Sequence, residues 1–113
     1  MSQASNYLEQ KLLDHVLRNT AYTSPTTVYV GLFKETVDTA TTVANLEAGT
    51  LTDEVANSHS YARVAVTFGA AHATNGSITT SGNVTFAAAN GGDFGVITHI
   101  AILDGNTHGS GNV

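Results

Sequence analysis

Hydrophobic residues near the start of the chain recur at helical spacing. They form one stripe, made of Leu8, Leu12, Leu13, Val16 and Leu17. Charged residues fall outside this stripe, so the pattern predicts an amphipathic helix over about residues 6–18, with Asn6 as its cap. Such a stripe needs a partner surface. It either covers the sheet of its own domain or packs on a neighbouring chain.

After Pro25 the pattern changes from helical periodicity to the alternation of β-strands. Segments rich in β-branched and aromatic residues predict strands at about residues 27–33, 60–68, 83–89 and 95–103. In the first strand, Gly31 allows a close backbone approach or a bulge. The last strand is apolar on both faces, which is typical of a strand that is central in a sheet or faces a partner chain.

The order of these elements predicts a mainly β fold. One N-terminal amphipathic helix followed by strands and turns indicates an antiparallel β-sandwich or an open barrel. A length of 113 residues fits a single domain over residues 1–113. Residues 34–60 show little periodicity, and we expect a long acidic loop there, with or without short elements of its own. Its carboxylates fit a solvated loop face better than a calcium site.

Charge is scarce in this chain. Charged residues make up 12% and hydrophobic residues 42%, whereas soluble domains carry roughly 25% charged residues. Small neutral polar residues must therefore coat much of the surface, and burying it against a partner costs little ion desolvation. Four scattered cations and a net charge of −5 argue against nucleic acid and anionic membranes as partners. We expect no membrane span and no secretion signal.

The titratable residues form no recognisable catalytic, cofactor-binding or metal-binding motif. No two of the five histidines have the i,i+4 spacing of a helical zinc motif, and nucleophile elbows and phosphate-binding loops are missing. His99 lies in the middle of a predicted strand, where a structural or interfacial histidine is more common than a catalytic base. We therefore predict a protein that is not an enzyme and has no cofactor. The alternative is a small hydrolase that uses the loop carboxylates and His59.

The order of the segments resembles a family of small virion proteins of tailed bacteriophages. The segments that carry the resemblance are NYLEQKLLDHVL, VYVGLF, SYARVAVTF, SGNVTFAAAN and GVITHIAILDG. Family members are described as tail-fibre proteins, and related small β proteins decorate capsids. The resemblance implies a structural protein located in the virion, with no catalytic residues. In the family pattern the final glycine-rich segment continues into further strands, whereas this chain stops at Val113.

We therefore predict a tail-fibre-like module that self-assembles into a homo-oligomer, for example a trimer, and contacts other virion proteins. The residues expected at the interface are Leu8, Leu12, Val16, Val96, Ile97, Ile100 and Ile102. A capsid decoration protein that cements the phage head is one alternative. A carbohydrate- or receptor-binding module is another, and its stacking surfaces would be Tyr7, Tyr22, Tyr29 and Tyr61.

Overall fold

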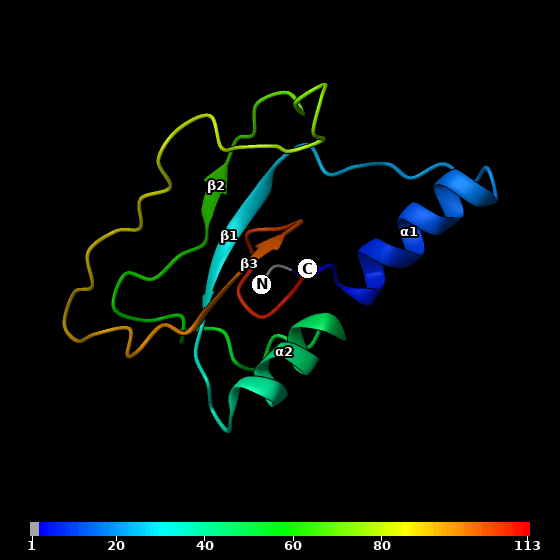
Figure 1. The fold of residues 1–113 in the computed structure, drawn as a ribbon. Coiled ribbons are helices and arrows are strands. Elements are labelled where there is room, and N and C mark those ends of the chain that lie inside the picture. Colours follow the sequence, from blue (N-terminus) through cyan, green and yellow to red (C-terminus); the bar gives the residue numbers. More distant parts are fainter. Residues whose placement is uncertain (1–2) are drawn as a thin grey trace.

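The chain folds around one small antiparallel sheet. A computed structural model describes residues 3–113. The elements in these residues are α1 (Asn6–Leu17), β1 (Val28–Phe33), α2 (Thr39–Glu47), β2 (Val64–Val66) and β3 (His99–Leu103). The strand order is β2-β1-β3, with β1 in the centre (Figure 1). The predicted antiparallel sheet with an N-terminal helix is present. The sheet is open, however, and residues 3–113 supply neither the second sheet of a sandwich nor a closed barrel.

The observed strands differ from the predicted ones. The strands predicted at residues 60–68 and 95–103 are confined to Val64–Val66 and His99–Leu103. Residues 83–89, predicted as a strand, form no strand. They belong to the long connection between β2 and β3, which arcs around the outside of the sheet (Figure 1). Phe86 holds this segment by stacking on Tyr61, with ring centroids 6.3 Å apart. Strand-like composition was misleading here: β2 is an edge strand with one unpaired side, but residues 83–89 form no ladder with it.

The helix α2 lies inside the acidic segment 34–60, where the sequence left open whether short elements were present. Asp38 caps this helix, and its carboxylate accepts a hydrogen bond of 2.7 Å from the backbone N–H of Thr41. Thr42 is the buried residue of α2. The helix is built mostly from threonine and alanine, so it has no large apolar stripe that periodicity could detect.

Pairing in register gives the sheet two different faces. Val30 lies opposite Ile102 and Leu32 opposite Ile100 in the β1–β3 pair. Directly paired residues of antiparallel strands project to the same side. This side, here called the aliphatic face, comprises Val28, Val30, Leu32, Val64, Val66, Ile100 and Ile102. Every one of its members is a valine, a leucine or an isoleucine.

The opposite face of the sheet carries the main core. Phe33, Ala101 and Leu103 are buried there together with Leu51, and Leu46 of α2 packs against them. Gly31 is required at the centre of this face, because a Cβ atom on it would lie 2.8 Å from Leu103 Cδ1. The close approach predicted at Gly31 is therefore present, and it brings a leucine side chain against the backbone of β1.

The helix α1 projects away from the sheet instead of covering it (Figure 1). None of its residues is buried. Its cap is Ser5 and not the predicted Asn6, because the hydroxyl of Ser5 accepts a hydrogen bond from the backbone N–H of Leu8 at 3.2 Å. Residues 18–27 then lead back from the tip of the helix to β1. We call residues 6–27 the arm. None of the helices within residues 3–113 is long and apolar enough to cross a bilayer.

Candidate interaction surface

The outer part of the arm exposes the apolar stripe that the sequence predicted. The exposed fractions are 48% for Leu12, 57% for Leu13, 72% for Val16 and 74% for Leu17. Leu8 differs, since it is partly buried near the base of the arm, in a shallow hollow that it lines with Val28 and Ile102. The alternative in which this stripe covers the protein's own sheet is therefore wrong for the outer turns of α1.

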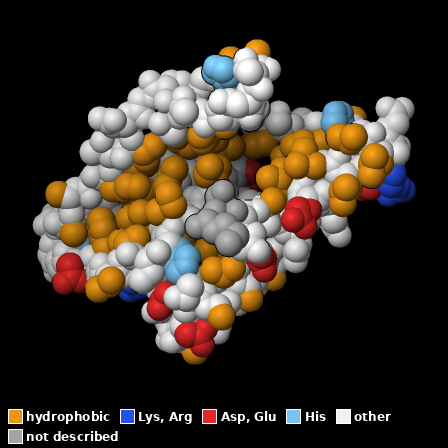
Figure 2. All heavy atoms as spheres, in the orientation of Figure 1, with side chains coloured by type: hydrophobic (Ala, Val, Ile, Leu, Met, Phe, Trp, Pro, Cys, Tyr) orange, Lys and Arg blue, Asp and Glu red, His pale blue; other side chains and the backbone are white. Residues whose placement is uncertain are grey.

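The aliphatic face is also partly open to solvent. Ile100 is 66% and Ile102 is 45% exposed, whereas the residues that alternate with them, Ala101 and Leu103, are buried. The last strand was expected to be apolar on both faces, and its outward face has no cover within residues 3–113. Figure 2 shows hydrophobic side chains gathered over the sheet and continuing along α1.

Of the seven residues predicted at an interface, five are exposed and two are partly buried. Leu12, Val16, Val96, Ile100 and Ile102 are the exposed ones. Leu8 lies at the base of the arm. Ile97 packs against the cluster formed by Leu32, Val55 and Tyr61. The structure thus places Leu12 and Val16 on the outer turns of α1, Ile100 and Ile102 at the β3 edge of the aliphatic face, and Val96 on the connection before β3.

The molecule as a whole exposes more surface than a compact monomer of its size. A monomer of 11.7 kDa is expected to expose about 5,900 Å2, whereas this chain exposes 7438 Å2. Its radius of gyration is 15.2 Å, compared with about 13 Å for a compact domain of this length. The arm and the long connection before β3 both contribute to the excess. The extended shape and the exposed apolar residues therefore agree: part of the hydrophobic surface of this chain is not covered by the chain itself.

A buried ion pair fixes the part of the fold that lies behind these surfaces. Arg63 donates from Nε to Glu54 Oε1 at 2.7 Å and from Nη2 to Glu54 Oε2 at 2.8 Å. The two side chains are 1% and 0% exposed. Tyr61 donates to Glu54 Oε1 at 2.9 Å and accepts from the Leu32 N–H at 3.0 Å. The network therefore ties the turn before β2 to the central strand.

The same network holds the glycine-rich end of the chain. Arg63 Nη1 donates to the carbonyl oxygens of Gly105 at 2.7 Å and Ser110 at 2.8 Å. The Gly109 N–H donates to Glu54 Oε2 at 2.8 Å. Arginine and glutamate are rarely buried unless they are paired, and here the hydrogen bonds that the pair makes to Gly105, Gly109 and Ser110 position backbone. We infer that this centre is structural.

Hydrogen bonds and burial set the proton affinities in the network. Burial alone would raise the pKa of Glu54, but hydrogen bonds from Arg63, Gly109 and Tyr61 outweigh it, so the pKa lies below its usual value. Burial is the main cause that raises the pKa of Tyr61 to about 12, and the neighbouring Glu54 adds to it. Glu54 is therefore a carboxylate and Tyr61 a neutral phenol at neutral pH.

Another loop carboxylate, Asp53, is also structural and not solvated as expected. It is buried, and it accepts hydrogen bonds from Thr36 Oγ1 and from Asn45 Nδ2, the latter at 2.9 Å. The bond from Thr36 contributes most to lowering the pKa of Asp53. The expectation of a solvated acidic face is thus wrong for Asp53 and Glu54. Sequence periodicity could not reveal this, because both acids lie outside regular elements.

The other candidate chemistry does not converge on one site. His59 contacts the carbonyl oxygen of Asn90 at 3.2 Å, and His99 contacts Thr98 Oγ1 at 2.9 Å. Within residues 3–113, no three His, Asp or Glu side chains gather as a ligand set for a metal ion. Tyr61, one of the four tyrosines considered for sugar stacking, is buried in the network. The hydrolase alternative needs His59 beside the loop carboxylates, whereas His59 contacts Asn90 and the carboxylates of Asp53 and Glu54 are bound by other side chains.

Comparison with known families gives one match, which covers nearly the whole chain. The family is described as Podophage GP4 fiber I protein gp80, and its model matches residues 3–113. No curated protein and no solved structure matches the chain.

Proposed function

Because the chain belongs to the family of podophage GP4 fiber I protein gp80, we propose that it is a non-enzymatic module of a phage tail fibre that assembles with further copies of itself. A fibre protein is a structural component of the virion, in agreement with the predicted resemblance to tail-fibre proteins. Association with other virion proteins follows from membership of a fibre. Self-association and the residues that mediate it are the new part of this proposal.

The observation that carries the proposal is the exposed apolar surface on α1 and β3. Val16, Leu17 and Ile100 are each at least 66% exposed. Single exposed apolar residues are normal, but contiguous patches on a soluble chain mark sites of protein association. The proposed interface consists of the residues predicted from the sequence, with Leu12, Val16, Ile100 and Ile102 as its exposed centre and Leu8, Val96 and Ile97 at its margins.

Light scattering of the purified protein tests self-association. We expect a mass several times the 11.7 kDa of one chain. Ile100→Asp should return the mass toward that of a monomer, because assembly would bury an unpaired charge. The variant should keep its circular dichroism spectrum, since Ile100 is exposed in the single chain. Thr85→Asp, at an exposed position on the long connection, is the control and should leave the mass unchanged. A wild-type protein that stays a monodisperse monomer at high concentration contradicts the proposal.

Electron microscopy of virions with a labelled chain tests the location in the tail. We expect the label on fibres. A regular lattice of label over the head would instead support the capsid decoration alternative. Binding of the purified protein on a glycan array, with no label on fibres, would favour the receptor-binding alternative.

A further inference from the structure

The chain carries two exposed apolar surfaces that do not cover each other. One is the convex stripe on the outer turns of α1. The other is the exposed edge of the aliphatic face, represented by Ile100 and Ile102. We propose that the outer turns of α1 in one copy dock on the aliphatic face of a second copy. This inference rests on the self-assembly proposed above and specifies its contact.

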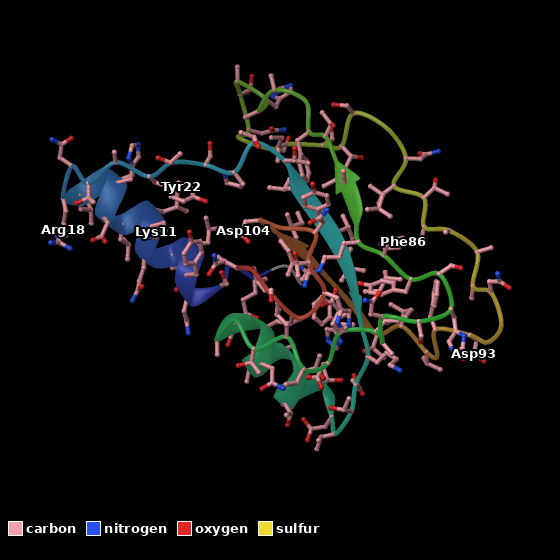
Figure 3. All side chains as sticks on the ribbon, turned by 180° about the vertical axis from the view of Figure 1, so that it is seen from behind. Lys11, Arg18, Tyr22, Phe86, Asp93 and Asp104 are labelled. Carbon is pink, nitrogen blue, oxygen red and sulfur yellow. The ribbon has the colours of Figure 1, made fainter. Side chains whose placement is uncertain are left out.

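The base of the arm keeps its outer turns away from the sheet of the same chain. Ser5 donates a hydrogen bond from Oγ to the carbonyl oxygen of Val113, which fixes the start of α1 beside the end of the chain. Near the tip, the Tyr22 N–H donates to His15 Nδ1 at 3.4 Å. Figure 3 shows Lys11 on α1, Arg18 directly after its end and Tyr22 on the segment that returns beside it. The first bond ties the start of α1 to the end of the chain, and the second joins α1 to its own return segment. The outer turns project from the sheet, so their stripe is open to another molecule (Figure 1).

Charge favours an apolar occupant for the aliphatic face. The three strands contain no lysine, arginine, aspartate or glutamate. Next to the stripe, Asp14 of α1 pairs with Arg18 at 2.9 Å, and Lys11 lies over the ring of Tyr7. Glu9 lies beside Leu12 and Leu13. Docking of the stripe on the face therefore strips water mainly from aliphatic side chains, with Glu9 as the carboxylate at its margin.

The surface area that the chain exposes beyond that of a compact monomer agrees with two docking contacts for each copy, one through its arm and one through its aliphatic face. The chain exposes about 1,500 Å2 more than a compact monomer of its mass. A standard protein interface buries about 800 Å2 on each partner. A copy that gives its arm to one contact and its aliphatic face to another would bury about 1,600 Å2 in total, which is close to the excess. A contact through one of the two surfaces would leave about half of the excess uncovered.

Cysteine cross-linking can test this contact because the natural chain contains no cysteine. One variant carries Leu13→Cys on the arm and a second carries Ile100→Cys on the sheet. Equal amounts are mixed, allowed to exchange and oxidised gently. We expect the mixed disulfide to exceed that of a control mixture of Leu13→Cys with Thr85→Cys by on the order of 10-fold, because docking raises the effective thiol concentration toward the millimolar range.

The other outcomes separate this inference from the proposed function. An oligomer by light scattering that gives no more mixed disulfide than the control mixture overturns the docking mode and leaves self-assembly intact. Disulfides that form chiefly between two Leu13→Cys chains indicate arm-to-arm packing and also overturn it. A chain carrying both substitutions that closes an internal disulfide as a monomer shows that the arm folds onto its own sheet. In that case both proposals fail.

Discussion

Arg63 binds both carboxylate oxygens of Glu54 in a place that solvent does not reach. The remaining donor of Arg63, Nη1, holds the carbonyl oxygens of Gly105 and Ser110. One arginine therefore links the turn before β2 to the last nine residues of the chain. The stability of the fold and the position of its C-terminal segment depend on the same side chain.

Replacement of Arg63 should be strongly destabilising. Arg63→Met leaves the Glu54 carboxylate buried without its partner, and we expect the free energy of unfolding to fall by about 3–5 kcal/mol. Urea denaturation followed by circular dichroism measures the change. The matched control is Arg18→Met, which breaks the exposed pair with Asp14 and should cost no more than about 1 kcal/mol. Equal losses for the two variants would contradict a structural role for the buried pair.

Acid should weaken the fold through Glu54. Its pKa in the folded protein lies below the reference value of 4.5, so its contribution to stability is complete above pH 4.5 and is lost as the pH falls through the lowered folded value. Urea midpoints measured from pH 7 down to pH 2 should show this loss. Glu54→Gln should have a lower urea midpoint at pH 7, and its midpoint should change less than that of the wild type as the pH falls. A variant with the slope of the wild type would show that other carboxylates control acid stability.

Alkali should act on Tyr61. Its pKa is raised from 10.0 to about 12 in the folded protein, so its contribution to stability is present below pH 10 and decreases as the pH rises toward 12. Tyr61→Phe should remove this decrease, at a cost of about 1–3 kcal/mol at pH 7 because Glu54 and the Leu32 N–H each lose a partner. Tyr7→Phe should keep the alkaline decrease of the wild type. Thermal unfolding between pH 8 and pH 11 distinguishes the variants.

A methyl group at Gly31 should disturb the core. The added Cβ would lie 2.8 Å from Leu103 Cδ1 and 3.2 Å from Phe33 Cε2, so both side chains must shift. We expect Gly31→Ala to lower the free energy of unfolding by about 1–3 kcal/mol. Gly82→Ala is the control, because no atom lies within 4 Å of its added Cβ. If both variants unfold at the same urea concentration, the packing of Leu103 on β1 is looser than described.

Periodicity predicted the elements whose large apolar residues repeat regularly. The leucine stripe indicated α1, and the alternation of Ile100 and Ile102 with Ala101 and Leu103 indicated the two sides of β3. Periodicity could not tell which side would be covered, because that depends on where the arm and α2 lie. It also predicted a strand at residues 83–89, where the composition fits a strand but the segment forms no ladder with the free edge of β2.

The buried network was beyond prediction for a different reason. Glu54 and Arg63 are nine positions apart and meet only in the folded chain, where Tyr61 also joins Glu54 to the backbone of Leu32. In a sequence, an arginine between alanine and valine and a glutamate in a loop read as surface residues. The usable signal for a buried ion pair was the scarcity of cations. In a chain with only four lysine and arginine residues, each one is a stronger candidate for a specific structural role.

The arm and the aliphatic face are different patches of one chain, and this difference governs how an assembly could grow. When two copies join by a single docking event, the pair still presents one vacant arm and one vacant face. Growth ends only when rotation from copy to copy brings the last arm to the first face, or when two copies exchange arms reciprocally. The angle between α1 and the sheet would then decide between a closed ring of few members and an open-ended filament.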